Sequence, residues 1–139
     1  MKRIVGLDLG SKTLGVAISD PLKLTAQGLT TIKFEEDAYK KAMRLLDELL
    51  VKHQVETFVL GDPKHMNGDV GVSSKRSLDF KERLEKKYDV KVVLWDERLS
   101  SVLVNRSMID MNMSRKKRKD VIDEMAAINI LQGYLDSIN

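Results

Sequence analysis

The chain has 139 residues, which suits one domain built around a single core. With 42% hydrophobic and 32% charged residues it has the composition of a folded globular protein, which argues against intrinsic disorder. The absence of cysteine excludes disulfides and thiolate metal sites. No apolar stretch approaches the roughly 20 residues of a membrane span, and no signal peptide follows Met1, so a cytoplasmic protein without a membrane partner is expected.

Apolar periodicity predicts three strands, followed by helices that alternate with two further strands. In chain order the predicted elements are strands 4–9, 14–19 and 28–34, a helix 37–53, a strand 56–60, a loop 61–74, a helix 75–88, a strand 90–95, and helices 100–111 and 120–138. This order predicts an α/β fold, with a mixed five-stranded sheet flanked by helices. Strands one to three are expected to be antiparallel, and strands four and five parallel. A single domain over residues 1–139 is expected, because no linker or repeat interrupts the chain.

Three acids occupy unusual places in this pattern. Asp8 lies inside the first strand, Glu97 follows the fifth strand, and Asp123 lies one turn into the last helix. Asp123 shares a helical face with Ala127 and Ile130. A small alanine at that spacing would let the helix lie close to the sheet and bring Asp123 toward the strand ends.

If the three carboxylates converge, they repel one another unless a cation neutralises them. Mg²⁺ or Mn²⁺ would do so, and two such ions about 4 Å apart can support hydrolysis of a phosphodiester. Gly6 and Gly10, on either side of Asp8, are interpreted as clearing space for a phosphate backbone.

The residues alone leave simpler roles open. Asp8 could anchor the turn at 11–13, and the two interpretations weigh equally. Asp96 and Glu97 could pair with Arg98, and Asp123 could complement the helix dipole. Whether Asp96 or Asp20 adds a metal ligand also stays open.

Four segments in order carry a resemblance that covers essentially the whole chain. They are "GLDLGSKTLGVAISD", "GDPKHMNGDVG", "WDERLSS" and "VIDEMAAINILQGYL". They resemble the motifs of the YqgF family, which comprises Holliday-junction-resolvase-like proteins of the RNase H-like superfamily, described as nucleases that process the 5′ end of pre-16S rRNA. The resemblance implies an RNase H-like fold, a divalent metal, and catalytic and metal-binding roles for Asp8, Glu97 and Asp123. Asp62 and Val72 depart from the family pattern, which affects the loop but not the acids.

Several basic and polar residues are expected to bind substrate. Arg98 belongs to the family motif, and its forked guanidinium suits a phosphate oxygen. Lys12 in the first turn, together with Lys64 and Asn67 in the loop, could touch substrate, although exposed surface roles are equally compatible with them. The cationic run Arg115, Lys116, Lys117, Arg118 and Lys119 precedes the last predicted helix and could contact several phosphates. Such a run can equally be solvated surface, and the net charge of only +3 is a weak indication of nucleic acid.

The expected function is hydrolysis of phosphodiester bonds in structured RNA by a metal-dependent endonuclease, with precursor rRNA or ribosomal precursor particles as partner. The first alternative is a Holliday junction resolvase acting on branched DNA, and the second is a non-catalytic RNA-binding ribosome assembly factor. A sugar-kinase-like ATPase is disfavoured because such enzymes bind nucleotide between two lobes. A monomer and a homodimer are both compatible with the sequence.

Overall fold

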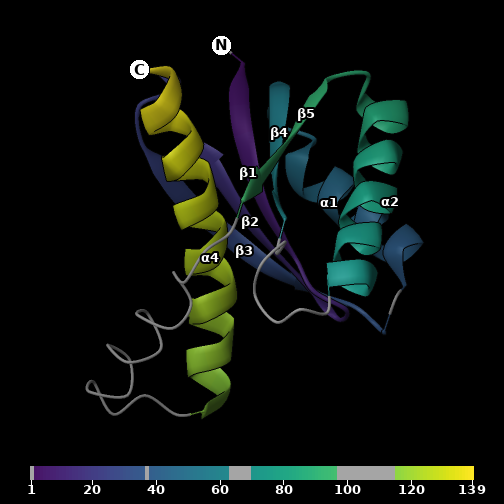
Figure 1. Ribbon diagram of the computed structural model, residues 1–139. Coiled ribbons are helices and arrows are strands. Elements are labelled where there is room, and N and C mark those ends of the chain that lie inside the picture. Colours follow the sequence, from purple (N-terminus) through teal and green to yellow (C-terminus); the bar gives the residue numbers. More distant parts are fainter. Residues whose placement is uncertain (1, 37, 63–69, 97–114) are drawn as a thin grey trace.

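The computed structural model describes residues 2–36, 38–62, 70–96 and 115–139, with side chains at 2–36, 38–61, 75–95 and 124–139 (Figure 1). The chain begins with three strands, after which helices and strands alternate. In order, the elements are β1 (Arg3–Leu9), β2 (Thr13–Ser19), β3 (Ala26–Lys33), α1 (Tyr39–Leu50), β4 (Val55–Asp62), α2 (Val70–Tyr88), β5 (Lys91–Asp96) and α4 (Arg115–Ile138).

The five strands form one mixed sheet in the order β3-β2-β1-β4-β5. β1 pairs antiparallel with β2, and β2 pairs antiparallel with β3. β4 lies parallel to β1 on its other side, and β5 lies parallel to β4. The predicted α/β fold with a mixed five-stranded sheet is therefore confirmed, and the carboxyl ends of β1, β4 and β5 meet at one end of the sheet.

Helices cover both faces of the sheet, with α4 on one side and α1 and α2 on the other (Figure 1). Alternate residues of β1 divide between two cores, as the pleat of a strand requires. Val5 and Leu7 are fully buried in the core on the α1 and α2 side, whereas Ile4 belongs to the core beneath α4. The side of the sheet that each residue of β1 faces is therefore fixed.

α4 lies very close to the sheet where it crosses β1. A Cβ built on Gly6 would lie 2.6 Å from Leu131 Cβ and 2.9 Å from the carbonyl oxygen of Ala127. The Glu124 side chain lies directly over Gly28 of β3 in the same way. The interpretation of Gly6 as space for a phosphate backbone is therefore wrong, because the helix fills that space.

Two helices begin earlier than predicted. α2 starts at Val70 rather than at 75, and α4 starts at Arg115 rather than at 120. The basic run is thus the start of the last helix, not a segment before it. The physical reason is that lysine and arginine favour helix and that the single glycine near the start of α2 costs only about 1 kcal/mol.

Other boundaries differ from the predicted ones by a few residues. β4 continues through Asp62, which the sequence had assigned to a loop. The predicted helix 100–111 lies outside the residues that the structure describes. Within those residues, no helix combines the length and apolar character that crossing a membrane requires.

Candidate active site at the carboxyl ends of the central strands

Asp8 occupies a row of residues that runs across the whole sheet. It pairs directly with Gly15 of β2, and Gly15 pairs with Thr31 of β3. On the other side, Leu7 pairs with Leu60, so Asp8 lies level with Gly61, the next residue of β4. Both neighbours of Asp8 are therefore glycines, and no side chain from an adjacent strand stands beside its carboxylate in this row.

The Asp8 side chain faces the layer that contains α4. Ile4, Gly6 and Asp8 alternate with the residues of the opposite core, and both Ile4 and Gly6 lie against α4. Asp8 is half-buried, in contrast to the fully buried Leu7 that precedes it. Its carboxylate thus lies on the α4 side, at the carboxyl end of β1.

The register of α4 carries the helix from Gly6 toward the end of the sheet where Asp8 lies, with Asp123 on its amino-terminal side. Gly6 lies beneath Ala127 and Leu131, which are one helical turn apart. Moving from Gly6 to Asp8 advances about 6.6 Å along the strand, and moving one further turn from Ala127 to Asp123 advances about 6 Å along the helix. The carboxyl-terminal half of α4 lies toward the start of β1, since Gln132 hydrogen-bonds to Ala26, so the two steps run in the same direction.

The third expected acid follows the end of β5. Asp96 is the last residue of that strand and pairs with Asp62, the last residue of β4. Glu97 is the next residue of the chain and lies outside the described residues. The amino-terminal half of α4, which carries Asp123, thus lies toward the end of the sheet where β1 and β5 end.

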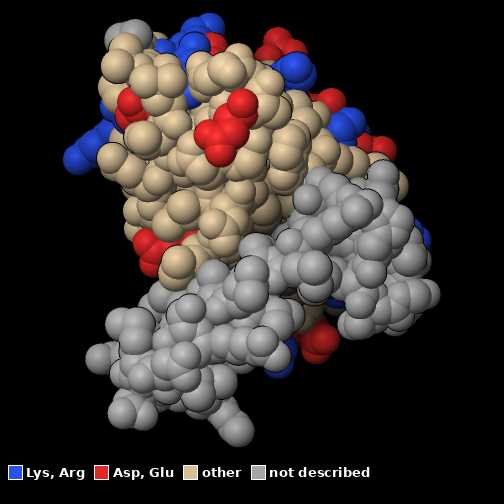
Figure 2. All heavy atoms as spheres, turned by 60° about the vertical axis from the view of Figure 1, so that its left-hand side comes forward, with Lys and Arg blue, Asp and Glu red and all other residues tan. Residues whose placement is uncertain are grey.

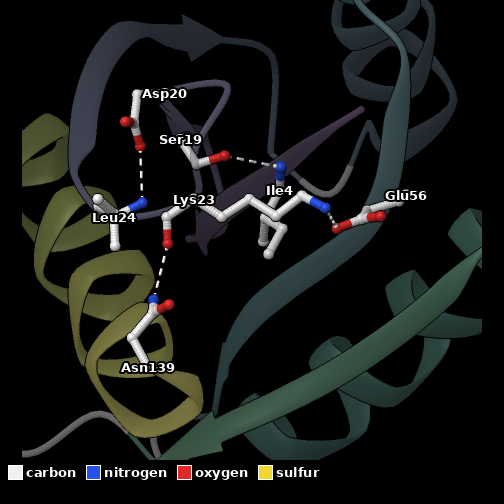
Figure 3. Close-up of polar contacts among 7 residues, drawn as sticks. All are labelled: Ile4, Ser19, Asp20, Lys23, Leu24, Glu56 and Asn139. Atoms are coloured by element: carbon white, nitrogen blue, oxygen red, sulfur yellow. Dashed lines mark hydrogen bonds and ion pairs between the residues drawn. The ribbon is translucent and has the colours of Figure 1, made fainter. Parts of the chain in front are cut away.

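Asp20, which was left open as an additional ligand, lies at the opposite end of the sheet. The residue before it, Ser19, accepts a hydrogen bond of 3.0 Å from the backbone N–H of Ile4 through its Oγ (Figure 3). Ile4 is near the start of β1, whereas Asp8 is near its end. Asp20 is therefore excluded from a cluster around Asp8.

The structure gives Asp20 a different role, in the connection between β2 and β3. Its Oδ1 accepts hydrogen bonds from the backbone N–H groups of Leu24 at 2.7 Å and Thr25 at 2.9 Å. These hydrogen bonds hold the pKa of the Asp20 carboxyl below its usual value, because they favour the charged form. The bond from Thr25 has the larger effect. Asp20 is a turn residue.

The expected substrate-binding residues are only partly placed. Lys12 is exposed in the turn between β1 and β2, at the same end of the sheet as Asp8. The backbone of 115–118 forms the first turn of α4, roughly 8 to 12 Å along the helix axis from Asp123. Lys64, Asn67 and Arg98 lie outside the described residues.

The donor chemistry at this end of the sheet fits a hard divalent cation. Mg²⁺ and Mn²⁺ favour carboxylate oxygens, and the acids of the expected set are all carboxylates. Among the residues whose side chains are described, no group of three acids or histidines forms a metal cluster. Asp8 is the one expected ligand in that part of the chain, and its neighbours on both adjacent strands are glycines.

Gly15 and Gly61 are the site residues that sequence reasoning missed. Each lies beside Asp8 only through strand pairing, and they are separated from it by 7 and 53 positions in the chain. Gly61 belongs to one of the four quoted segments. Gly15 lies within a predicted strand, and Gly61 directly follows one. Glycine inside a strand often marks close approach of a ligand, which was the available signal.

Trp95 ends the same row on β5, where it pairs with Gly61. Its indole packs on Gly133 of α4 and meets the Tyr134 ring edge-on, with centroids 5.9 Å apart. Trp95 is partly buried and packs against the core beneath α4. The row therefore ends in a fixed aromatic contact that holds β5 against α4.

Comparison with known proteins gives consistent matches over the whole chain. The family described as "RuvX: Holliday junction resolvase" matches residues 2–137. A protein of Bacillus licheniformis named "Putative pre-16S rRNA nuclease" is 54% identical over 137 residues, covering 99% of each chain. Proteins of the same name from Bacillus subtilis and Clostridium perfringens are 52% and 50% identical, covering 99% of this chain and 99% and 98% of theirs.

Solved structures show the same fold at low sequence identity. Thermus thermophilus RuvC in complex with a Holliday junction substrate has a TM-score of 0.57 at 16% identity, covering 99% of this chain and 96% of that chain. The Fowlpox virus resolvase in complex with Holliday junction DNA has a TM-score of 0.56 at 16% identity, covering 98% of both chains. The fold is thus RNase H-like. With four motifs in order and a family match along nearly its entire length, the chain belongs to the RuvX (YqgF) family of Holliday-junction-resolvase-like proteins.

Proposed function

We propose that this protein is a metal-dependent endonuclease that cleaves structured RNA and processes the 5′ end of pre-16S rRNA during ribosome biogenesis in the cytoplasm. The observation that carries the proposal is the position of Asp8 at the carboxyl end of the central strand, between two glycines and on the face of the sheet that α4 covers. The names of relatives 50–54% identical over nearly the whole chain support the choice of RNA.

In this proposal Asp8, Glu97 and Asp123 hold one or two Mg²⁺ or Mn²⁺ ions. When bound, the metal would lower the pKa of a water molecule and stabilise the leaving oxygen of the phosphodiester. The carboxylates would position the ions, and the packing of α4 on β1 fixes how the helix that carries Asp123 lies over the strand that carries Asp8. The close packing of α4 on Gly6 thereby becomes part of the construction of the site.

The cations and polar groups near this end of the sheet would hold the strand to be cut. Arg98 can bind one phosphate through two parallel hydrogen bonds, whereas Lys12 and Lys64 act as point charges. Asn67 can donate to a phosphate or to a base edge. The group Arg115, Lys116, Lys117 and Arg118 at the start of α4 adds a sequence-independent contact to the backbone.

The first prediction tests the role of Asp8. In Asp8→Asn, metal-dependent cleavage of a precursor 16S rRNA fragment should fall by at least about 100-fold. Mutating a residue that only hydrogen-bonds to a metal ligand already lowers activity by about 10- to 100-fold, and Asp8 is proposed to be a ligand itself. Cleavage is measured by gel electrophoresis of end-labelled RNA with and without Mn²⁺. The far-UV circular dichroism spectrum and the affinity for RNA in EDTA should remain close to those of the wild type.

Asp20→Asn is the matched control, because it removes the same charge at the opposite end of the sheet. It should cleave like the wild type. Cleavage by Asp8→Asn at the wild-type rate with the same dependence on Mn²⁺ would contradict the proposal. Metal-dependent turnover by the wild type, with many RNA molecules cut per protein, would exclude a purely structural assembly factor.

A resolvase acting on branched DNA is the second candidate, favoured by the family description and by the shared fold with RuvC and the Fowlpox enzyme. The same acids would serve both substrates. A four-way DNA junction, a plain duplex and the RNA fragment are therefore compared in one assay. Symmetric incision of the junction needs two active sites, so it requires a homodimer, whereas a strict monomer supports the RNA assignment.

A further inference from the structure

α1 and α2 lie side by side on the face of the sheet opposite α4 (Figure 1). Tyr39 and Phe80 meet edge-on with centroids 6.1 Å apart. Eight residues further along each helix, the Tyr88 hydroxyl donates a hydrogen bond of 3.2 Å to Asp47 Oδ1. The equal spacing shows that the two helices run parallel, in matched register.

A groove of about 370 Å³ lies between these helices. Met43, which is buried, contributes its apolar side chain, and the other lining residues are cations on the rims. We call this feature the basic groove and define it by its lining residues Lys40, Met43, Arg83, Lys86 and Lys87.

Three of the four cations make no ion pair within the part of the chain that the structure describes. Lys87 lies 3.8 Å from Asp47 Oδ2, but Lys40, Arg83 and Lys86 have no such contact there, and all three are exposed. Like charges gathered in one groove repel one another, and a bound anion relieves that repulsion. The groove therefore has the charge of a site for phosphate groups.

The basic groove begins near the candidate active site. α1 starts after β3, whose last residues pair with the start of β2 beside the β1–β2 turn. In that turn the carbonyl of Lys12 accepts a hydrogen bond of 2.9 Å from Phe34 N–H. Lys12, Lys33 and Lys40 are exposed along this path, and two acids at 35–36 lie between Lys33 and Lys40. A basic route thus leads around the end of the sheet, from the α4 side to the α1 and α2 side.

The surface around the carboxyl-terminal half of α4 differs from the groove. Most of what is described there is uncharged, with a group of acids within this area and further acids and bases along its edges (Figure 2). Met125 and Ile138 of α4 are exposed, as are Leu22 and Leu24 of the neighbouring connection. The cations of the basic groove therefore offer a phosphate backbone contacts that the uncharged part of this surface does not.

We propose that the basic groove binds the sugar–phosphate backbone of the nucleic-acid substrate at a segment distant from the cleaved bond. The proposal rests on the proposed function, because the substrate must extend from the active site around the end of the sheet. Lys40 and Lys86 act as point charges, and Arg83 can engage one phosphate with two hydrogen bonds. The lining offers no exposed aromatic side chain for stacking on bases, so the contact reads phosphate positions and not sequence.

The test is the triple variant Lys40→Gln, Arg83→Gln, Lys86→Gln. Binding to a long structured precursor rRNA fragment is measured by fluorescence anisotropy in EDTA at several salt concentrations. Losing about three phosphate contacts should reduce the slope of log K against log[salt] by about 2 to 3. In Mn²⁺, KM for the long RNA should rise roughly 10-fold at unchanged kcat, and cleavage of a short RNA limited to the cleaved region should not change.

The matched control removes three exposed lysines outside the groove, in the variant Lys41→Gln, Lys52→Gln, Lys91→Gln. It has the same net charge as the test variant and should keep the salt slope within about 1 of the wild type. Equal slopes for the test variant and the control would overturn the role of the groove, as would equal losses on the long and the short RNA.

Failure of the groove and failure of the proposed function give different results. If the groove is wrong, the salt slope is unchanged while Asp8→Asn still abolishes cleavage. If the nuclease assignment is wrong, Asp8→Asn cleaves like the wild type or no protein cleaves, while the loss of slope in the groove variant still shows that the groove binds nucleic acid.

Discussion

Among single residues, Gly6 decides how close α4 lies to the sheet. In Gly6→Ala the new methyl group would meet Leu131 Cβ and the Ala127 carbonyl, and the second of these is backbone that cannot rotate away. We expect the free energy of unfolding to fall by about 1–3 kcal/mol, the usual cost of overpacking a core. Urea denaturation followed by circular dichroism measures it as a lower midpoint at unchanged slope.

Gly10→Ala provides the control for this prediction. Its new Cβ would lie 3.1 Å from Thr13 Oγ1, the end of a side chain that can turn aside, so a loss below about 1 kcal/mol is expected. Equal losses for Gly6→Ala and Gly10→Ala would show that helix packing is not the reason for Gly6. The sequence could not separate the two glycines, because a close ligand and a close helix both call for a missing side chain.

Between elements, Gln132 joins α4 to the edge strand β3. Its Oε1 accepts a hydrogen bond of 2.9 Å from Ala26 N–H, and its Nε2 donates one of 3.0 Å to the Leu24 carbonyl. Gln132→Ala should lower the free energy of unfolding by about 1–2 kcal/mol, because it leaves a partly buried backbone donor without its acceptor. Thermal and urea unfolding measure the loss.

Asn129→Ala on the same helix is the control for Gln132→Ala, because Asn129 is exposed. It should change the stability by less than about 0.5 kcal/mol. An equal loss in both variants would point to helix propensity and not to the bridge. Periodicity predicted every strand of the described sheet and the type of each described helix, but it misplaced the starts of α2 and α4. The missed residues of α4 are charged helix formers without an apolar signal, and those of α2 include a glycine and two serines, which are typical of loops.

At the scale of the whole molecule, the proposed metal site would couple three distant parts of the chain. If Asp8, Glu97 and Asp123 hold Mn²⁺, the ion binds the folded state and stabilises it by about 2.7 kcal/mol at 100 times its Kd. The Tm of the wild type should therefore rise with Mn²⁺ in differential scanning calorimetry. Asp8→Asn should lose most of this rise, and without metal its Tm should equal or exceed that of the wild type, because a like charge is removed.

Asp20→Asn should keep the full rise in Tm with Mn²⁺, because this acid lies at the other end of the sheet. The same rise in Asp8→Asn and the wild type would exclude Asp8 as a ligand. The rise in Tm with Mn²⁺ does not depend on cleavage. It therefore tests whether the acids share a metal ion, whichever nucleic acid is the substrate.

The sequence by itself determined the fold class, the strand order along the chain and the family, because hydrophobic periodicity and ordered motifs are local properties that a chain displays before it folds. It also identified Asp8 as an acid out of place in a strand. The tertiary structure decided which residues stand beside that acid in the sheet, Gly15 and Gly61, through strand pairing. It also excluded Asp20 and formed the basic groove, because pairing and packing join residues that sequence spacing does not relate.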